Sequence, residues 1–414
     1  MNPNAYYRLP WTLNDNVLSW LEPTKKCNIY CDGCYSTNEA NSHKSMSDVR
    51  SDLDVFTAHR KMDSVSIAGG DPLTHPEIVE IVRVIRHEYH LKPVVNTNGH
   101  AMTPTLLHDL KQAGLHGVTF HVDSSQRRPG QPRMGELDLC ELRLSLAQMV
   151  ANEGGLTCAF NATIFRDTAH LVPALIRWAQ DHIEIVHSMV FILFRTARTA
   201  EFHYFAEGRP VELDSVAYYD QDQNPAPLTT PELFGIIQTE IPDFEASAYL
   251  GGTQDPTSFK WTLVGRIGNR QDIHGYVGKH FMELVQTGHH ALAGTYLAYS
   301  HPALLKQGRA MLLAFAPFDA GIRKGTRRWL RGVAENPLSA ARRLHFQSFA
   351  FIQPIDHMAD GRANMCDGCP DMTVHNGQLV WSCRLDELKK HGSFLSCSPR
   401  QRQTGWGAES HSAK

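Results

Sequence analysis

The sequence predicts an α/β protein built on a partial (β/α)6, TIM-like barrel, with a mostly helical insertion and a small C-terminal metal-binding hairpin module. Strand-like and helix-like segments alternate through the first 200 residues, which is typical of a parallel sheet with right-handed crossovers. After Ala200 this alternation stops and helical patterns predominate. Near the C-terminus two strand-like runs flank Asn376-Gly377, a turn signal typical of a β-hairpin, beside a group of cysteines.

Six segments have the apolar composition of buried strands. They are NVLSWLEP (16–23), SVSIAGG (64–70), PVVNTNG (93–99), GVTFHVDSS (117–125), LTCAFNATIF (156–165) and VHSMVFILFR (186–195). The segments between them have helical spacing and run over 46–61, 75–90, 103–114, 136–155 and 168–182. Start and stop signals support these helices, with Ser47 as a cap candidate, Pro76 near one start and Gly114 at one end.

The length of 414 residues exceeds what one core usually spans, so several units are expected. The predicted units are a barrel core (1–200), a mostly helical insertion that would carry substrate specificity (201–350), a cysteine module (351–397) and a polar tail that should be disordered (398–414).

The predicted insertion contains an apolar run, MLLAFAPF (311–318), followed by a basic group. The basic residues are Arg323, Lys324, Arg327, Arg328, Arg331, Arg342 and Arg343. One hypothesis is an amphipathic lid or membrane-surface patch that suits a lipid-like or phosphate-bearing substrate. The alternative is that the apolar residues form helix core and the arginines a solvated face.

The composition excludes several protein classes. A formal net charge of −3 provides no global attraction to nucleic acid, so no nucleic-acid partner is expected. No signal peptide and no bilayer-spanning apolar stretch is evident, which predicts a cytoplasmic protein. In a reducing compartment, clustered cysteines bind metal or do chemistry more often than they form disulfides. Of nine cysteines, Cys140 and Cys158 fall in helical and strand patterns and are expected to be buried apolar thiols.

The first cysteine group is Cys27, Cys31 and Cys34, with C-x3-C-x2-C spacing just past the first strand. Three thiolates can hold three irons of a cubane 4Fe–4S cluster and leave the fourth iron open for a small molecule. A structural zinc site needs four closed ligands, usually from separated pairs, so the tight trio favours the cluster.

At these residues the sequence resembles the radical S-adenosylmethionine (radical SAM) superfamily, in which Asn28 and Tyr35 correspond to common neighbours of the cysteines. One departure is Gly33, where the family often has an aromatic residue before the third cysteine. The other resembling motifs end successive strands, where ligands of parallel sheets bind. They imply S-adenosylmethionine-binding residues at Gly69, Gly70, Asp71, Pro72, Asn98, Asp123, Ser124 and Asn161.

The chemistry of S-adenosylmethionine gives physical reasons for several of these implied binding residues. The glycines of "AGGDP" would let backbone carbonyls approach the methionyl ammonium, and Asp71, which replaces the family's glutamate, would complement its charge. Asp123 and Ser124 would bind ribose hydroxyls or the methionyl carboxylate, and Asn161 would point into the cleft.

The resemblance implies a chemistry. A donor such as flavodoxin or ferredoxin would reduce the cluster, and cleavage of S-adenosylmethionine would give a 5′-deoxyadenosyl radical that takes hydrogen from the substrate. Nothing in the sequence identifies a catalytic residue, or whether the cofactor is consumed. The non-enzymatic alternative is a scaffold with structural zinc or iron–sulfur sites.

The second cysteine group is Cys366, Cys369 and Cys383, followed by Cys397. The predicted hairpin would return Cys383 to the other two. One interpretation is a zinc ribbon closed by Cys397. The other is an auxiliary 4Fe–4S cluster, because the spacing resembles the molybdopterin-precursor enzymes and the SPASM/twitch extensions. Cys397 would then either close the cluster or leave one iron free.

Features outside the cysteine groups disfavour some subfamilies of the radical SAM superfamily. Only 26 residues precede Cys27, so no cobalamin-binding or leader-peptide-binding domain is expected there. The C-terminal "ESHSAK" lacks the Gly-Gly end of the molybdopterin-precursor family. The substrate is therefore left as a small molecule, a lipid or a peptide.

Overall fold

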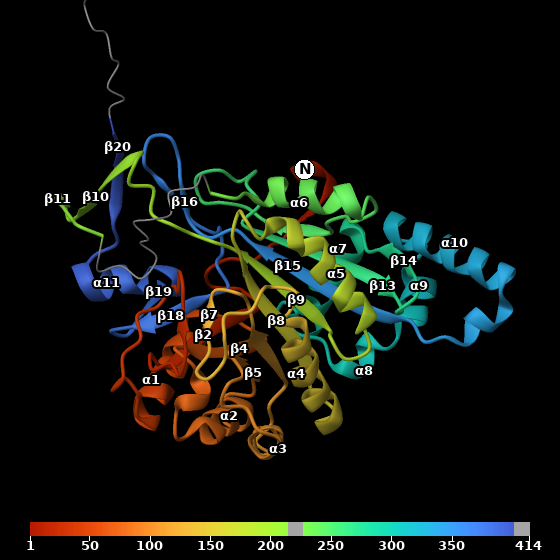
Figure 1. Cartoon of the computed structure of the whole chain (residues 1–414), viewed down its shortest axis with the longest axis horizontal. Helices are drawn as coiled ribbons and strands as arrows, with labels where there is room; N and C mark the ends of the chain where they lie inside the picture. Colours follow the sequence, from red (N-terminus) through yellow and green to blue (C-terminus); the bar gives the residue numbers. More distant parts are fainter. Residues whose placement is uncertain (214–226, 401–414) are drawn as a thin grey trace, which may run out of the picture.

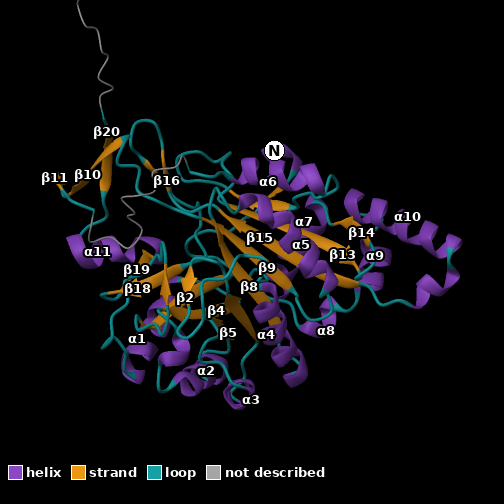
Figure 2. Ribbon diagram, in the orientation of Figure 1, coloured by secondary structure: helices purple, strands orange, loops and turns teal. Residues whose placement is uncertain are grey.

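The computed structural model of the chain describes residues 1–213 and 227–400. Its centre is an 11-stranded mixed sheet with helices on its outer face (Figure 1). The strand order is β1-β12-β13-β15-β9-β8-β6-β5-β4-β2, and β14 pairs with β13. Figure 2 shows the helices grouped around this curved sheet.

The six predicted barrel strands are confirmed. They are β2 (Leu18–Thr24), β4 (Ser64–Gly69), β5 (Lys92–Thr97), β6 (Gly117–His121), β8 (Thr157–Ile164) and β9 (Ser188–Leu193). Each pairs in parallel with the next. Because the strands are parallel, their carboxyl ends meet at one edge of the sheet.

Five helices connect these strands and cover the outer face. They are α1 (Met46–His59), α2 (Ile78–His87), α3 (Pro104–Gln112), α4 (Cys140–Glu153) and α5 (Val172–Asp181). Their apolar sides join the main core with strand residues such as Val95, Phe120 and Phe160. The predicted cap of α1 is off by two residues, because Ser45 forms the capping box with Asp48. Of the two thiols expected to be buried, Cys158 is fully buried and Cys140 is half-buried.

The sheet continues past β9 with strands from much later in the chain. These are β15 (His345–Ile352), β13 (Trp261–Gly268), β14 (Ile273–Tyr276), β12 (Ala248–Leu250) and β1 (Tyr7–Arg8). β15 is parallel to β9, whereas β13 is antiparallel to β15. The sequence prediction places no strand at 345–352, although buried and half-buried side chains alternate along β15.

Within its described residues, 201–213 and 227–350, the segment predicted as a mostly helical insertion contains five α-helices as well as strands. The helices are α6 (Thr230–Glu240), α7 (Lys279–Ala293), α8 (Pro302–Leu305), α9 (Gly308–Phe315) and α10 (Ala320–Glu335). Figure 1 shows α9 and α10 projecting at one end of the molecule.

The C-terminal module contains the predicted hairpin. β18 (Met372–His375) pairs with β19 (Gln378–Trp381), and both Asn376 and Gly377 have positive φ as a two-residue hairpin turn requires. Helix α11 (Leu385–His391) follows, and β20 (Ser396–Pro399) pairs with β10 (Phe202–Ala206). Residues 401–414 of the predicted disordered tail lie outside the described residues.

The remaining elements are short. The strands are β3 (Tyr30–Cys31), β7 (Gln126–Arg127), β11 (Arg209–Pro210), β16 (Asp356–His357) and β17 (Ala363–Asn364), and the 3-10 helices are Pro3–Ala5, Pro72–Thr74, Ala169–Leu171, Pro337–Ala341 and Ser382–Arg384. Among the described helices, none has the length and apolarity that crossing a bilayer would require.

A buried ion pair supports the loop after β6. The Arg143 guanidinium on α4 pairs with Glu136 and donates to the Val122 carbonyl oxygen at 2.7 Å, and the Arg143 and Glu136 side chains are both fully buried.

Arg143→Met should lower the free energy of unfolding by about 3–5 kcal/mol, because it leaves the Glu136 carboxylate buried without its partner. Urea denaturation measures the loss. The exposed Arg83–Glu80 pair is the control, and Arg83→Met should cost less than about 1 kcal/mol.

Candidate functional site

The loop that carries the first three cysteines follows β2 at the carboxyl edge of the barrel. Its short strand β3 pairs with β7, which aligns Cys31 with Gln126. The Cys27 amide donates to Asn38 Oδ1 at 2.9 Å, and Asn98 Nδ2 lies 3.7 Å from Cys27 Sγ. The loop is therefore held by segments that follow three barrel strands, β2, β5 and β6. All three cysteine residues are half-buried.

Burial is the main influence on the pKa values of these three thiols. It raises the pKa of Cys27, Cys31 and Cys34 above the ordinary thiol value. Like-charge repulsion between neighbouring thiolates adds to the rise for Cys31. A bound cationic centre would remove this penalty, since metal ligation favours deprotonated thiols. The trio thus has the donor set that a metal cluster needs.

The two glycines that end β4 make close backbone contacts. Gly69 has φ +112°, and a side chain there would overlap the Thr24 carbonyl oxygen. A side chain at Gly70 would overlap the Lys26 carbonyl oxygen. These glycines therefore let the end of β4 touch the backbone of the cysteine loop. Whether they also let a carbonyl approach a ligand stays a prediction.

The Asp71 carboxylate is fully buried and bonded within the protein. It accepts hydrogen bonds from Thr97 Oγ1 at 2.8 Å, the Asn98 amide at 2.8 Å and the Leu73 amide at 3.0 Å. Burial raises the pKa of Asp71, and these hydrogen bonds oppose the rise. The carboxylate thus clamps the end of β4 to the turn after β5. Its predicted role beside a ligand ammonium is untested.

Asp123 is also fully buried. It accepts hydrogen bonds from His121 Nε2 at 2.7 Å, the Thr163 amide at 2.9 Å and the Ser125 amide at 3.0 Å. Burial alone would raise the pKa of Asp123, but His121 and the hydrogen bonds hold it well below the usual range. With both oxygens engaged, this carboxylate orients its neighbours, and His121, whose side chain is 35% exposed, is the more accessible group.

Asn161 and Ser124 lie near Asp123. The Asn161 side-chain oxygen is buried and has no hydrogen-bond partner among the described residues. An orphaned buried acceptor on the strand next to His121 suits a donor from a bound ligand. The Ser124 amide donates to Glu136 Oε2 at 2.9 Å. Pro72 begins a 3-10 turn that Asp71 caps.

One buried cation at this edge is absent from the sequence prediction. Arg128 donates to the Asn98 carbonyl oxygen at 2.8 Å and to Gln126 Oε1 at 2.6 Å, and burial lowers its pKa. Its Nε has no partner among the described residues. The signal was the basic pair Arg127-Arg128 directly after the fourth barrel strand.

A cavity of ≈ 850 Å³ opens beside the loop. The described lining includes no carboxylate and consists of Cys27, Asn28, Ile29, Tyr30, Asn38, Arg127, Arg128, Pro129, Gln131 and Arg133. Three arginines line the cavity, and because Arg127 and Arg133 share the single partner Asp32, the lining keeps a net positive charge.

The end of β9 touches both cysteine groups. A side chain at Gly33 would overlap the Phe194 ring, which stacks on Phe165 at 4.4 Å between ring centroids. The next residue, Arg195, donates from Nη1 to the Cys383 carbonyl oxygen at 2.8 Å. The Phe194 ring thus occupies the space into which a side chain at position 33 would project.

The second cysteine group packs against the barrel beside α1 and β2 (Figure 1). Cys366 and Cys369 are buried in one apolar cluster with Trp11. Their mutual hydrogen bond raises the pKa of Cys369 and lowers that of Cys366, and burial raises the pKa of Cys383 to about 11. The Arg60 guanidinium donates to the Cys369 carbonyl oxygen at 3.1 Å.

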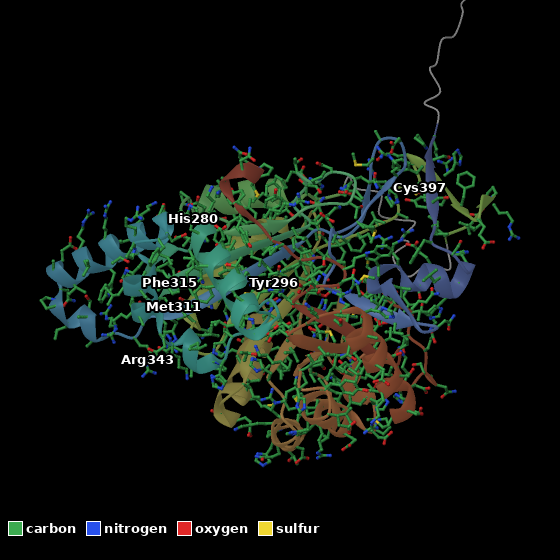
Figure 3. All side chains as sticks on the ribbon, turned by 180° about the vertical axis from the view of Figure 1, so that it is seen from behind. His280, Tyr296, Met311, Phe315, Arg343 and Cys397 are labelled. Carbon is green, nitrogen blue, oxygen red and sulfur yellow. The ribbon has the colours of Figure 1, made fainter. Side chains whose placement is uncertain are left out.

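Cys397 lies in different surroundings. It is on β20 opposite Tyr204 of β10, at the edge of a separate small apolar cluster (Figure 3). Burial raises its pKa to about 12. Within the described residues no three His, Cys, Asp or Glu side chains are gathered for a single metal ion. In an iron–sulfur cluster, by contrast, each cysteine binds a different iron.

Comparisons with known proteins cover the barrel. Residues 21–179 match the family model described as the radical SAM superfamily. The probable GTP 3′,8-cyclase of Pyrococcus abyssi is 33% identical over 106 residues, or 25% of this chain and 34% of that protein. The PqqA peptide cyclase of Gluconobacter oxydans is 23% identical over 176 residues, or 41% of this chain and 49% of that protein. The chain thus spans a third to a half of these relatives.

Similarity to solved structures is weaker. SuiB of Streptococcus suis bound to S-adenosylmethionine has 16% identity and a TM-score of 0.35, over 44% of this chain and 42% of that chain. This similarity is too low to support an inference.

The Asp71 clamp makes a testable prediction. Asp71→Ala leaves buried donors at residues 73, 97 and 98 without an acceptor, which should lower the free energy of unfolding by about 2–4 kcal/mol. Because Asn98 contacts Cys27, the variant should also retain less iron after anaerobic reconstitution. The control is Asp109→Ala on the exposed side of α3. Unchanged stability and iron content in Asp71→Ala would show that the clamp is dispensable.

Proposed function

The chain belongs to the radical SAM superfamily, and on that premise we propose that it binds a 4Fe–4S cluster and reductively cleaves S-adenosylmethionine to a 5′-deoxyadenosyl radical that abstracts hydrogen from an organic substrate. The observation that carries this proposal is the loop of Cys27, Cys31 and Cys34 at the carboxyl edge of six parallel strands. Three thiols in one loop suit a cluster with one iron open to the cofactor.

The proposed roles of the other residues follow from their contacts. Gly69, Gly70 and Pro72 shape the backbone around the cysteine loop. Asn98 lies against Cys27 at the cofactor side. Asn161 provides an unpaired buried acceptor for the cofactor.

The acidic and hydroxyl residues of the predicted cofactor site are proposed to act mainly by positioning. Asp71 holds the turn after β5, and Asp123 holds His121. Ser124 is fixed through its backbone amide by Glu136, so its hydroxyl is the part proposed to reach the ligand.

For the second group we propose an auxiliary 4Fe–4S cluster on Cys366, Cys369 and Cys383. Two of these thiols share a buried cluster, and all three influence one another electrostatically. Cys397 lies in a different apolar cluster from Cys366 and Cys369, although it shares the charged neighbours Arg195, Arg384 and Glu387 with Cys383. We propose a trio that leaves one iron free. The competing assignment is a zinc ribbon, in which Cys397 joins these three cysteines as the fourth ligand.

The proposed partners are an electron donor and an unidentified substrate. An acidic flavodoxin or ferredoxin would suit the positive cavity beside Cys27, where Tyr30 and Arg127 are exposed. The relatives include GTP cyclases and a peptide cyclase. Because the chain covers at most about half of those two proteins, the proposed substrate stays a small molecule, a lipid or a peptide.

Cofactor cleavage is the first test. Anaerobically reconstituted protein given dithionite and S-adenosylmethionine should release 5′-deoxyadenosine, measured by liquid chromatography. Cys31→Ala should abolish release because the cluster loses a ligand, while Cys140→Ala should not. Absence of product from wild-type protein with a full iron complement would support the non-catalytic scaffold instead.

Metal analysis tests the second site. The triple variant Cys27→Ala/Cys31→Ala/Cys34→Ala should retain about four irons per chain if the auxiliary site holds a 4Fe–4S cluster. Cys397→Ala in that background should leave the count unchanged, whereas Cys383→Ala should reduce it. Zinc without iron in the triple variant would rule out the auxiliary cluster.

A further inference from the structure

The helices after β14 form a lobe of their own, defined here as residues 279–344 and called the helical lobe. It comprises α7 to α10 and the turn 337–341. Figure 1 places α9 and α10 at the end of the molecule opposite α11 and β20. Figure 3 shows Met311, Phe315 and Arg343 at one end and Cys397 at the other. The lobe therefore lies away from the second cysteine group.

Charge is segregated into the helical lobe. It contains ten lysines and arginines but three acidic residues, a net charge of +7 with histidine neutral. The whole chain carries −3, so all the other residues together carry −10. One of the three acids, Asp319, is buried and caps α10. The exposed surface of the lobe is thus strongly basic, within a chain that is otherwise acidic.

Much of this positive charge is not neutralised. On α10, Lys324 and Arg328 share a single partner, Asp243. The exposed side chains of Arg327, Arg331, Arg342 and Arg343 make no ion pair or hydrogen bond with any described residue. An array of unpaired arginines gains free energy near an anionic surface.

Exposed apolar side chains gather on the same lobe. Seven of the eleven exposed large apolar residues among the described residues lie in it: Leu284, Leu292, Leu304, Leu313, Phe318, Leu330 and Leu338. Leu292 is 92% exposed, Leu338 82% and Phe318 61%. Single exposed apolar residues are ordinary on a protein surface, but the concentration of seven of them in one short basic segment favours an interaction surface.

The exposure of these side chains does not result from the lack of an apolar core in the lobe. The lobe has its own buried cluster of Val277, Phe281, Leu312, Ile322, Trp329 and Leu344 with β13. Gly325 of α10 packs directly on the backbone of Gly275 in β14. The exposed leucines therefore lie on helices that are packed against β13 and β14.

A small cavity of ≈ 360 Å³ lies at the base of the lobe. Lys306, Arg309 and Arg343 line it with Gln307, Ala303 and Leu344, and no acid is in that described lining. Three cations around one hollow suit a phosphate group.

From these observations we propose that the helical lobe docks the protein on an anionic phospholipid bilayer. Its arginines would face the phosphates, and its exposed leucines and Phe318 would enter the headgroup region, as in surface-bound amphipathic helices. Nucleic acid is the less suitable partner because it offers no apolar phase for seven exposed side chains. This proposal does not depend on the proposed radical chemistry.

Vesicle co-sedimentation of the full chain is the test. Vesicles of phosphatidylcholine mixed with phosphatidylglycerol should bind the protein at low salt, while vesicles of phosphatidylcholine alone should bind it much more weakly. Arg327→Glu/Arg331→Glu should weaken binding by at least about tenfold. Leu292→Ser/Leu338→Ser should weaken it with no change in charge. Arg50→Glu/Arg83→Glu, the same charge change on α1 and α2, should have little effect.

Two results would overturn the proposal. One is no binding to the anionic vesicles at low salt. The other is binding that the leucine variant retains in full and that short duplex DNA removes, because that pattern indicates a general polyanion site. Circular dichroism and 5′-deoxyadenosine release on each variant show whether the barrel is intact, so failure of docking is distinguishable from failure of the proposed chemistry.

Discussion

The carboxyl edge of the barrel depends on buried polar groups that are hydrogen-bonded within the protein. The Asp71 carboxylate is central, because it accepts from the side chain of Thr97 and from backbone amides on two connections. Such a group is costly to bury unless every acceptor site is used. Here its bonds join the end of β4 to the turn after β5, and Asn98 in that turn reaches Cys27. The position of the cysteine loop is thus linked to the satisfaction of one carboxylate.

The C-terminal module packs along the edge strand β2 and so contacts both ends of the barrel. Arg60 at the end of α1 donates to the Cys369 carbonyl oxygen, and Arg195 after β9 donates to that of Cys383. Thr37 in the first cysteine loop donates to Asp386 Oδ2 at 2.9 Å. Hydrogen bonds therefore join residues more than three hundred positions apart, at the start of β2 through Arg60 and after its end through Thr37.

The barrel could be predicted from the sequence because each strand–helix unit has a local apolar pattern. The cysteine loop and the hairpin turn could be predicted for the same reason, because each is defined by residues that are close together in the sequence. β15 was missed because its partners, β9 and β13, are distant in the chain. For Asp71 and Asp123 the residue type suggested ligand contact, but only the fold reveals that their oxygens are already bonded internally. Arg128 was missed because a buried cation depends on carbonyl groups that only tertiary structure brings together.

The contact between Gly33 and Phe194 has a consequence for how such chains diverge. The two residues share one volume, although 160 positions separate them. In a homologue with an aromatic residue at position 33, either position 194 must hold a smaller side chain or the cysteine loop must move. Changes at these positions should therefore appear as a correlated pair in an alignment. Because Arg195 follows directly, the exchange would also shift the guanidinium that donates to the Cys383 carbonyl oxygen, so changes near the two cysteine groups should be coupled.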